Sequence, residues 1–563
     1  MGKIIETTIN RFDGAIAGDP KDQRLNVARF ISNGDVFTNP KRILPYRQTE
    51  SGDENATTLR KQNFAIARRT LTAGVPIYSV CGLGVASGTN RGTVQTLDLD
   101  SSLNTDVWTA GAGSGDADYA AKFDCFVYYQ NQDLIFGWAH FATGGTFAGV
   151  RIFSYNPTTA AWTDNAGGGL ATQGNINTIV AQGLVHSKDD RCYMAADNLV
   201  FSKNGSGAFA LALTLPVNIR IASMCEYGDF IAILASDRNG VSNSRVFIWD
   251  RNETTTTLSE SLDAGTGTGL IIEIVDGELI VISQKGGEAQ AFAGGSSSDG
   301  TSIFSEMPQS SITARDKVIF RQLAGNRFVK IFELRSDRIG GSGSTSVFRH
   351  KQLVDNRLFF QMIIRYNGSV RDGLWSFGRS GPGEPFTLVR EQPSNNNTAL
   401  TTGDIMRGFL VVGDFIFQSF GSGGSGATYN TRKTVEITDT SYSANTIIET
   451  ITYDGSRHGF NESFYKDLSE VSIMTDSMVT AGVVQVDYAI NIDADDGIGS
   501  WTTIFTNSTN SSISHTANNI ESSGAALPKR YKNIAFRIIA TGGAIVTGLE
   551  FKEDVIEKRY VTD

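Results

Sequence analysis

The sequence predicts an all-β protein, and three observations support this prediction. Charged residues make up only 19% of the 563 residues, whereas glycine occurs 60 times. Low charge with abundant glycine, serine and threonine is typical of short strands joined by tight turns. A turn containing glycine or aspartate, followed by a short apolar strand, also recurs along the chain. Because single cores stop growing near roughly 250–300 residues, repeats or several domains are expected.

The recurring pattern indicates a ring of small sheets. Its first half reads YGDFIAIL at 227–234, VDGELIVI at 275–282, VDNRLFF at 354–360 and VGDFIF at 412–417. Its second half, an aromatic strand, reads RIFSYN at 151–156 and RVFIWD at 245–250. The turn anchors Asp229, Gly277, Asn356 and Asp414 are 48, 79 and 58 residues apart. A period of roughly 50 residues is typical of four-stranded propeller blades. Residues 64–458 are therefore predicted to form a six- or seven-bladed β-propeller, although two or three independent β-sandwiches also fit this period.

Two different segments flank the repeats. Residues 1–63 contain X-Pro pairs at 19–20, 39–40 and 44–45, which favour extended backbone, together with apolar anchors such as Phe12. We expect an extended N-terminal arm that lies on its own domain or on a neighbour, with a disordered tail as the alternative. Residues 459–563 alternate more regularly, as in VVQVDYAI at 483–490. This alternation predicts a small C-terminal β-sandwich.

The charge of the chain is unevenly distributed. The net charge is −10, but residues 1–69 hold 12 Lys+Arg against 8 Asp+Glu, a net of +4, which leaves −10 − 4 = −14 for the remainder. An acidic body disfavours a DNA-reading function, yet DNA could pass nearby without sticking. The basic arm is the candidate partner-docking site. Its candidate residues are Arg11, Phe12, Arg24, Arg29, Lys41, Arg42, Tyr46 and Arg47.

No arrangement of residues indicates an enzyme, a metal site or a cofactor site. The four cysteines are widely spaced and predict buried apolar positions, and the five histidines form no metal-binding pair. His186, Ser187 and Asp189 are sequence neighbours on one strand and turn, whereas a catalytic triad is assembled in space. The acidic run at 491–497 misses the calcium-loop spacing and predicts a hairpin turn. Paired carboxylates from distant strands remain an open possibility, because their spacing in the sequence is unconstrained.

Two further patterns bear on packing and on membranes. The repeated tryptophans at 138, 162, 249 and 375 are interpreted as blade-packing residues rather than as platforms for sugars. No run of about 18 apolar residues occurs, so we expect no membrane span. The first residues also lack the apolar stretch of a secretory signal.

Several segments resemble a family of tailed-bacteriophage virion proteins. They read NRFDGAIAGDP at 10–20, LNVAR at 25–29, TNP at 38–40, LPYR at 44–47, AQGLVHSKDD at 181–190 and NSRVFIWDR at 243–251. The resemblance spans most of the chain and contains no catalytic motif. It implies a structural protein of the phage tail, located in the virion after synthesis in the cytoplasm of the host bacterium.

Phage proteins of this size with a propeller are similar to the tail nozzle or hub. The resemblance therefore implies a homo-oligomeric ring around the DNA exit channel, in contact with the adaptor or tail ring and with fibres. DNA would pass through during ejection without specific binding. The first alternative is a peripheral adhesin or fibre-base protein that binds a host receptor. The second is a glycan depolymerase, which would be an enzyme.

Overall fold

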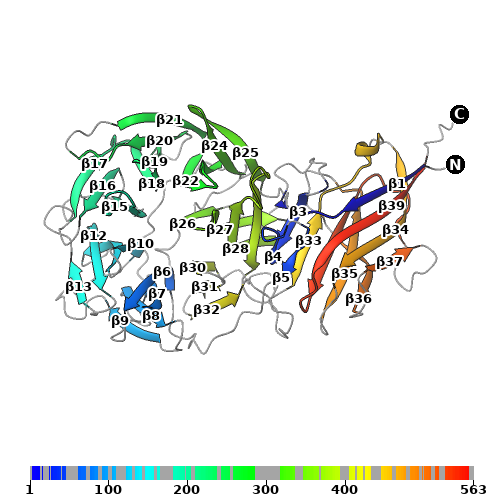
Figure 1. The fold of residues 1–563 in the computed structure, drawn as a ribbon, viewed down its shortest axis with the longest axis horizontal. Coiled ribbons are helices and arrows are strands. Elements are labelled where there is room, and N and C mark those ends of the chain that lie inside the picture. Colours follow the sequence, from blue (N-terminus) through cyan, green and yellow to red (C-terminus); the bar gives the residue numbers. More distant parts are fainter. Residues whose placement is uncertain are drawn as a thin grey trace.

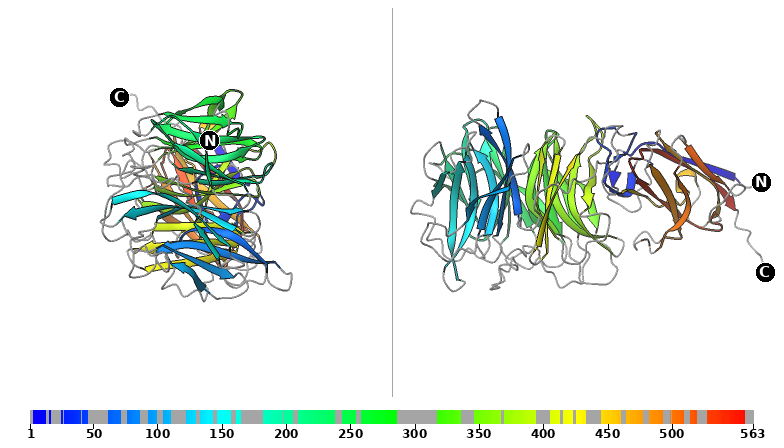
Figure 2. Two further views of the ribbon diagram at one scale, coloured as in Figure 1. Left: turned by 90° about the vertical axis from the view of Figure 1, so that its left-hand side faces the viewer. Right: turned by 90° about the horizontal axis from the view of Figure 1, so that it is seen from below.

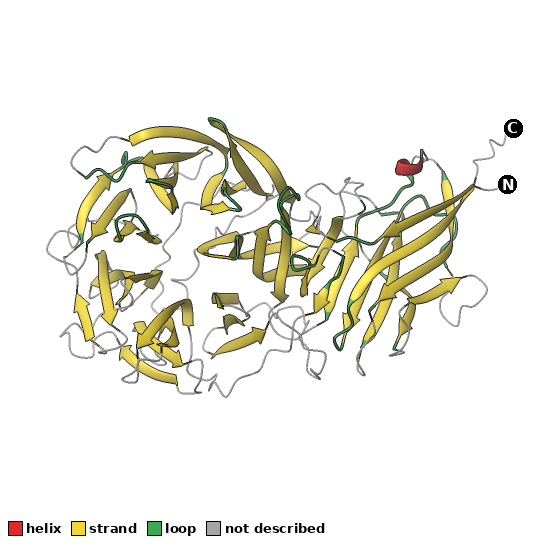
Figure 3. Cartoon of the chain, viewed as in Figure 1, coloured by secondary structure: helices red, strands yellow, loops and turns green. Residues whose placement is uncertain are grey.

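The computed structural model describes the chain between residues 3 and 556, with gaps. The longest gaps are 46–60, 110–121, 165–181, 286–316, 336–345, 394–404 and 433–444, and for the strands between 61 and 164 the backbone path is described. Strands dominate the described part (Figure 3). They form a ring of seven small sheets and a second body that follows it along the longest axis of the molecule (Figures 1 and 2).

The first four sheets of the ring are four-stranded antiparallel meanders in chain order. Sheet 1 contains β6 (Lys61–Thr70), β7 (Pro76–Val85), β8 (Gly92–Asp98) and β9 (Asn104–Thr109). Sheet 2 contains β10 (Lys122–Tyr129), β11 (Asp133–Ala142), β12 (Thr146–Asn156) and β13 (Ala161–Asp164). Sheet 3 contains β14 (Gln182–His186), β15 (Arg191–Ala196), β16 (Leu199–Lys203) and β17 (Ala210–Thr214). Sheet 4 contains β18 (Ile219–Tyr227), β19 (Phe230–Asp237), β20 (Asn243–Trp249) and β21 (Leu258–Thr266).

The last three sheets repeat this arrangement. Sheet 5 contains β22 (Thr268–Val275), β23 (Glu278–Lys285), β24 (Lys317–Ala324) and β25 (Arg327–Arg335). Sheet 6 contains β26 (Ser346–Val354), β27 (Arg357–Tyr366), β28 (Ser369–Gly378) and β29 (Thr387–Pro393). Sheet 7 contains three described strands, β30 (Ile405–Val412), β31 (Phe415–Ser422) and β32 (Ser425–Arg432).

The ring is closed by contacts between the first strands of the sheets. Strand β6 lies beside β10, and the series continues through β14, β18, β22 and β26 to β30, which lies beside β6 again. Figure 1 shows this circular arrangement, which is that of a β-propeller. Closure matters physically because each small sheet must bury both of its faces against neighbours, and a closed ring leaves no end sheet exposed.

Tight turns join the strands along one rim of the ring. Asp276 and Gly277 between β22 and β23 have φ values of 51° and 80°, and Asp355 and Asn356 between β26 and β27 have 50° and 59°. Positive φ at both central residues is the geometry of a type I′ turn, which matches the twist of the strands that it joins. The turns predicted from glycine and aspartate in the sequence are confirmed at these positions.

Apolar side chains from neighbouring sheets interlock. Trp249 and Trp375 are both 0% exposed, which confirms that these two tryptophans pack between blades. Trp249 meets Tyr193 edge-on at 5.7 Å between sheets 4 and 3, and Phe320 of sheet 5 stacks on Phe377 of sheet 6 at 4.5 Å. The side chains of the other two repeated tryptophans, 138 and 162, lie outside the described residues. Cys192 and Cys225 are buried free thiols, as expected, and the remaining two cysteines are also outside the described side chains.

The second body is a β-sandwich. One sheet has the order β1-β39-β34-β37, built from β1 (Lys3–Ile9), β34 (Tyr465–Thr475), β37 (Ser514–Asn518) and β39 (Val546–Ile556). The facing strands are β3 (Val27–Ser32), β33 (Thr446–Thr450), β38 (Ile534–Thr541), β35 (Val483–Ile490) and β36 (Thr502–Asn507). Strand β2 (Ala15–Ile16) pairs with β3, while β4 (Gly34–Asp35) pairs with β5 (Leu44–Pro45). The short 3-10 helix η2 (Ser456–His458) lies between β33 and β34.

The N-terminal segment corrects the predicted division of the chain. Its described part is not an extended arm, because β1 pairs with the C-terminal strand β39 and β3 pairs with β33. Strand β33 also precedes the predicted boundary at residue 459. The physical reason is burial: the core-facing side chains Ile5 and Ile9 are each 3% exposed against the sandwich core. Strand β3 also pairs with β29 of sheet 6, so one ten-stranded sheet joins the propeller to the sandwich.

Candidate functional site

The predicted docking residues near position 11 are held by the chain itself. Phe12 is 3% exposed and belongs to the apolar core of the sandwich, which corrects its assignment to a partner surface. Its neighbour Arg11 donates a hydrogen bond of 3.1 Å to Glu384, which follows β28 in sheet 6. These two side chains therefore attach the N-terminal segment to its own sandwich and propeller.

The remaining docking candidates divide into three groups. Arg29 lies on β3 and is partly buried. Lys41 and Arg42 are exposed, and the guanidinium of Arg42 lies 3.1 Å from Asp476. Arg24, Tyr46 and Arg47 lie outside the described residues. Partner docking by Lys41 and Arg42 stays a prediction.

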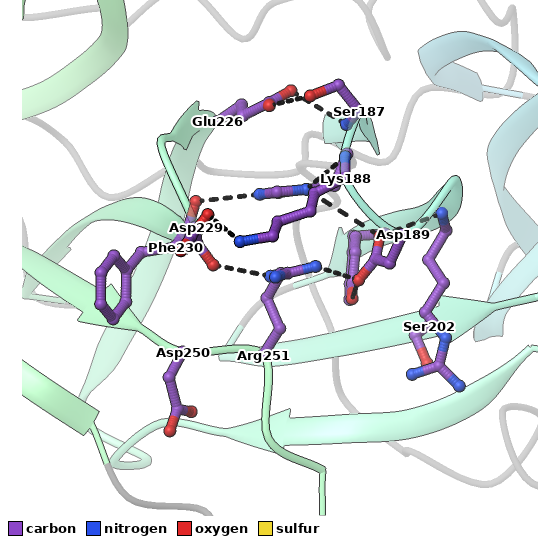
Figure 4. A network of polar contacts seen from close by, with 12 residues as sticks. Ser187, Lys188, Asp189, Ser202, Glu226, Asp229, Phe230, Asp250 and Arg251 are labelled. Atoms are coloured by element: carbon purple, nitrogen blue, oxygen red, sulfur yellow. Dashed lines mark hydrogen bonds and ion pairs between the residues drawn. The ribbon is translucent and has the colours of Figure 1, made fainter.

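The turn at 186–190 forms a polar cluster on the rim between sheets 3 and 4 (Figure 4). His186 is 0% exposed, and its Nδ1 accepts a 3.2 Å hydrogen bond from the backbone N–H of Lys188. Its Nε2 lies 3.3 Å from the carbonyl oxygen of Phe230 in sheet 4 and is therefore the protonated nitrogen. Ser187 donates instead to Glu226, so the histidine ties two blades together and does not activate the serine.

Three ion pairs in this cluster cross the boundary between the same two sheets. Arg251 pairs with Asp189, Lys188 pairs with Asp229, and Arg191 lies 2.6 Å from Glu253. The hydroxyl of Tyr193 also donates to Asp189, at 3.0 Å, and burial together with this carboxylate raises the pKa of Tyr193 to about 12. Because Asp189, Asp229 and Glu253 each pair with a cation of the neighbouring sheet, the arrangement serves to hold the blades together.

Side chains also bind the inner edges of the first strands. The outermost backbone groups of a sheet need partners, and the inner strand of each blade has one free edge. Gln352 on β26 receives a 2.7 Å hydrogen bond from the N–H of Val411 on β30 and donates one of 2.6 Å to its carbonyl oxygen. Ser223 on β18 accepts from the N–H of Ile272 on β22 at 3.1 Å.

Lys351 spans three blades at this inner edge. Its ammonium donates to the carbonyl oxygens of Met224 on β18, at 2.8 Å, and of Ile272 on β22, and it pairs with Glu273 at 2.8 Å. One side chain from sheet 6 thus reaches sheets 5 and 4. These three blades are consecutive in the ring, so Lys351 ties them together along one side of the propeller axis.

We expect Gln352→Leu to destabilise the ring by about 1–3 kcal/mol, because the Val411 N–H and carbonyl then lose their partner. Thermal unfolding of the full chain measures this change. Gln352→Glu is the matched control, since its carboxylate still accepts from the N–H but cannot donate to the carbonyl. An unchanged midpoint in the leucine variant would show that water replaces the lost partner.

The outward face of sheet β1-β39-β34-β37 carries a band of carboxylates. Residues in β1 and β39 alternate between the core and the solvent, and the strand register aligns the outward ones in adjacent rows. The carboxylates are Glu6, Asp467, Glu470, Glu550 and Asp554. Within the described part of this face the single cation among them is Lys552, 3.0 Å from Glu470 and 3.9 Å from Glu550.

Other kinds of site are not seen in the parts of the chain that the structure describes. Those residues contain no group of three side chains able to hold a metal ion. Among the described elements, no helix has the length and apolar character needed to cross a membrane.

Comparison with known proteins assigns no family. No protein-family model and no curated relative matches the chain. Similar solved structures include an exo-β-1,3-galactanase of Phanerochaete chrysosporium, with 11% identity, a TM-score of 0.30, and coverage of 87% of this chain and 100% of that one. A Trypanosoma rangeli sialidase mutant has 9% identity, a TM-score of 0.32, and coverage of 90% and 95%. Likenesses this weak carry no conclusion about fold or activity.

The acidic face has a measurable electrostatic signature. Partial burial, followed by the hydrogen bond and the repulsion from Glu6, raises the pKa of Glu550 above its ordinary value of 4.5. A carboxyl with a raised folded pKa favours the folded state when protonated, so stability from this group falls as pH rises through that pKa.

We expect Glu6→Gln to remove much of this loss of stability at higher pH. Thermal unfolding midpoints are compared from about pH 4 to about pH 8. The variant and the wild type should have similar midpoints at the acid end, and the variant should have the higher midpoint at the basic end.

The pH test has a matched control on the same strand. Thr8 is opposite Glu550 but is uncharged, so Thr8→Val should leave the pH profile of the wild type unchanged in shape. Parallel profiles for Glu6→Gln and the wild type would contradict the assigned interaction.

Sequence reasoning missed this face, although a signal was present. The carboxylates of β39 occupy alternate positions at 550 and 554 around Lys552, and the period of two marks one side of a strand. What the sequence could not supply is the pairing of β39 with β1 and β34, which lie far away in the chain. That pairing brings Glu6, Asp467 and Glu470 to the same face.

Proposed function

We propose that the chain is a non-enzymatic structural component of a phage tail, nozzle-like or hub-like, built from a seven-bladed propeller and a sandwich. Copies would assemble as a ring around the DNA exit channel. The proposal starts from the resemblance of the sequence segments to tailed-phage virion proteins. Two structural features support it: the ion pairs and hydrogen bonds that link neighbouring blades, and the sheet that continues from the propeller into the sandwich. Both make the chain rigid, as a component of a particle must be.

The observation that carries the proposal is the acidic face of the sandwich. Glu6, Glu470 and Glu550 lie in neighbouring rows around Lys552. A wall of this charge repels phosphates, so DNA passes along it without being retained. Because this face belongs to the sandwich and lies outside the ring of blades, the proposed channel lies between copies and not within one copy.

Cryo-electron microscopy of the virion that contains this chain tests the proposal. We expect a closed ring on the tail axis with Glu6, Glu470 and Glu550 directed toward the lumen. An off-axis position at the periphery of the particle would overturn the channel function. That result would favour binding of a host receptor, the alternative considered from the sequence.

A biochemical test addresses the charge of the wall directly. Particles carrying Glu470→Lys and Glu550→Lys together should release DNA more slowly and with a stronger dependence on salt, because cations on the wall bind phosphates. The control replaces Asp250, an exposed carboxylate on the propeller rim, with lysine. Equal slowing by both changes would contradict a lumen-facing wall.

A further inference from the structure

The far end of sheet β1-β39-β34 exposes three large apolar side chains on one face. Ile4 is 64% exposed, Tyr465 39% and Ile556 36%. Tyr465 lies directly opposite Ile556, and Ile4 lies opposite Asp554, diagonal to Ile556. We call these three side chains the apolar strip. Exposed apolar residues are ordinary when scattered, but adjacent ones mark an interaction surface.

The row that contains Ile4 also carries two opposed carboxylates. Asp467 on β34 is directly opposite Asp554 on β39. Like charges at such positions destabilise a sheet. Asp467 accepts a 2.7 Å hydrogen bond from the backbone N–H of Arg530, and in the described part of the chain no cationic side chain forms an ion pair with either aspartate. The row therefore suits a ligand that brings positive charge.

The chain itself carries a segment of matching chemistry. Strand β39 ends at Ile556, within the apolar strip, and the sequence EKRYVTD follows at 557–563. It combines two cations, Lys558 and Arg559, with the apolar bodies of Tyr560 and Val561. Of the residue types that most often turn a chain back on itself, it contains one, Asp563 at its end.

The length of this segment is sufficient for a neighbouring sheet. Seven extended residues span at most roughly 24 Å. Three adjacent strands are about 10 Å wide between their outer axes. A segment that leaves its own sheet at Ile556 can therefore cross the apolar strip of an adjacent copy.

We propose that the apolar strip and the Asp467–Asp554 pair bind residues 557–563 of a second copy of this chain. Lys558 and Arg559 neutralise the two aspartates, while Tyr560 and Val561 cover the strip. The contact is heterologous, and such contacts generate closed rings or open filaments. The inference rests on the proposed function, because it supplies the contact between copies in the ring and leaves Glu6, Glu470 and Glu550 facing the channel.

Crosslinking between isotopically distinct copies tests which chain provides the segment. The full-length protein carrying Tyr465→benzoylphenylalanine is prepared in unlabelled and nitrogen-15 forms, mixed at high salt, returned to low salt and irradiated. We expect crosslinks from position 465 to residues 557–563 that join a light peptide to a heavy one. Crosslinks only within one isotope form, or none to this segment, would overturn the proposal.

Sedimentation of full-length variants provides an independent readout. Ile4→Lys and Asp467→Lys should each weaken self-association at least tenfold, and deletion of 557–563 should weaken it as strongly. Val217→Lys is the matched control, because Val217 is 78% exposed and lies in the propeller between β17 and β18. The control should change association less than twofold, and equal effects of all four variants would contradict a specific strip. Circular dichroism verifies that each variant is folded.

The two proposals fail in different ways. A ring on the tail axis together with crosslinks confined to single copies would refute the inference and leave the proposed function intact. Light-to-heavy crosslinks combined with an off-axis position in the virion would do the reverse.

Discussion

Glu391→Ala is expected to weaken the junction between propeller and sandwich by about 3–5 kcal/mol, the usual cost of leaving one partner of a buried ion pair alone. Glu391 on β29 is 0% exposed and pairs with Arg357 on β27. Ser376 donates a hydrogen bond to the same carboxylate. Removing the carboxylate leaves the guanidinium buried without its principal counter-charge.

The N-terminal segment shares this charged cluster, which is why the change should reach the junction. Asp35 lies 3.8 Å from Arg357, and the guanidinium is 3.8 Å from the centre of the Phe37 ring. The neighbouring backbone contributes as well, because the N–H of Asn33 donates to the carbonyl oxygen of Arg390 at 3.1 Å. Arg357 is therefore held jointly by sheet 6 and by the segment that follows β3.

Native-state hydrogen exchange at the Asn33 amide measures the effect locally, which suits a chain of more than one domain. The matched control is Glu384→Ala, since Glu384 follows β28 in the same sheet and forms a partly exposed ion pair with Arg11, unlike the buried pair of Glu391. Its removal should change stability by less than about 1 kcal/mol. Equal exchange rates in the two variants would show that the buried pair does not support the junction.

The propeller was predictable from the sequence because its information is local. Turns such as Asp276–Gly277 and the apolar strands after them follow one another within a few residues, and the repeat makes each unit recognisable. The sandwich was only half predictable for the opposite reason. Strands β34 to β39 show the period of two, whereas β1 and β3 join them through pairings between the two ends of the chain.

The candidate site follows the same rule. The turn at 186–190 was visible in the sequence as a cluster of polar residues. Its Ser187 and His186 bind different partners, Glu226 and the carbonyl oxygen of Phe230, and do not bind each other. The acidic face was not predicted, because its carboxylates come from three strands far apart in the sequence. Phe12 was read as a docking residue since an apolar side chain in a proline-rich segment fits a partner surface as well as its own core.

Lys466→Met should destabilise the sandwich by about 3–5 kcal/mol. Lys466 is 0% exposed, and its ammonium donates to the carbonyl oxygens of Asp454 at 2.5 Å and Lys532 at 2.6 Å. It also offsets the charge of Glu553, which is 1% exposed and accepts a 2.7 Å hydrogen bond from Tyr531. Methionine retains the volume but leaves two carbonyls and a buried carboxylate without the cation.

The loss should depend on pH with a defined sign. Burial raises the pKa of Glu553, whereas the hydrogen bond from Tyr531 and the charge of Lys466 lower it. Without Lys466 the folded pKa rises further, so the variant loses stability as pH increases from the unfolded value through the folded one. Thermal unfolding at acid and neutral pH should therefore show a smaller deficit at acid pH.

Two companion variants separate this electrostatic effect from lost packing. Lys466→Met combined with Glu553→Gln should abolish the pH dependence, because glutamine is neutral and still accepts from Tyr531. Lys529→Met, a change of the same type at an exposed position of the sandwich, should leave the thermal midpoint nearly unchanged. A deficit for Lys466→Met that is constant with pH would mean that the two carbonyls, and not Glu553, are the groups that require this buried lysine.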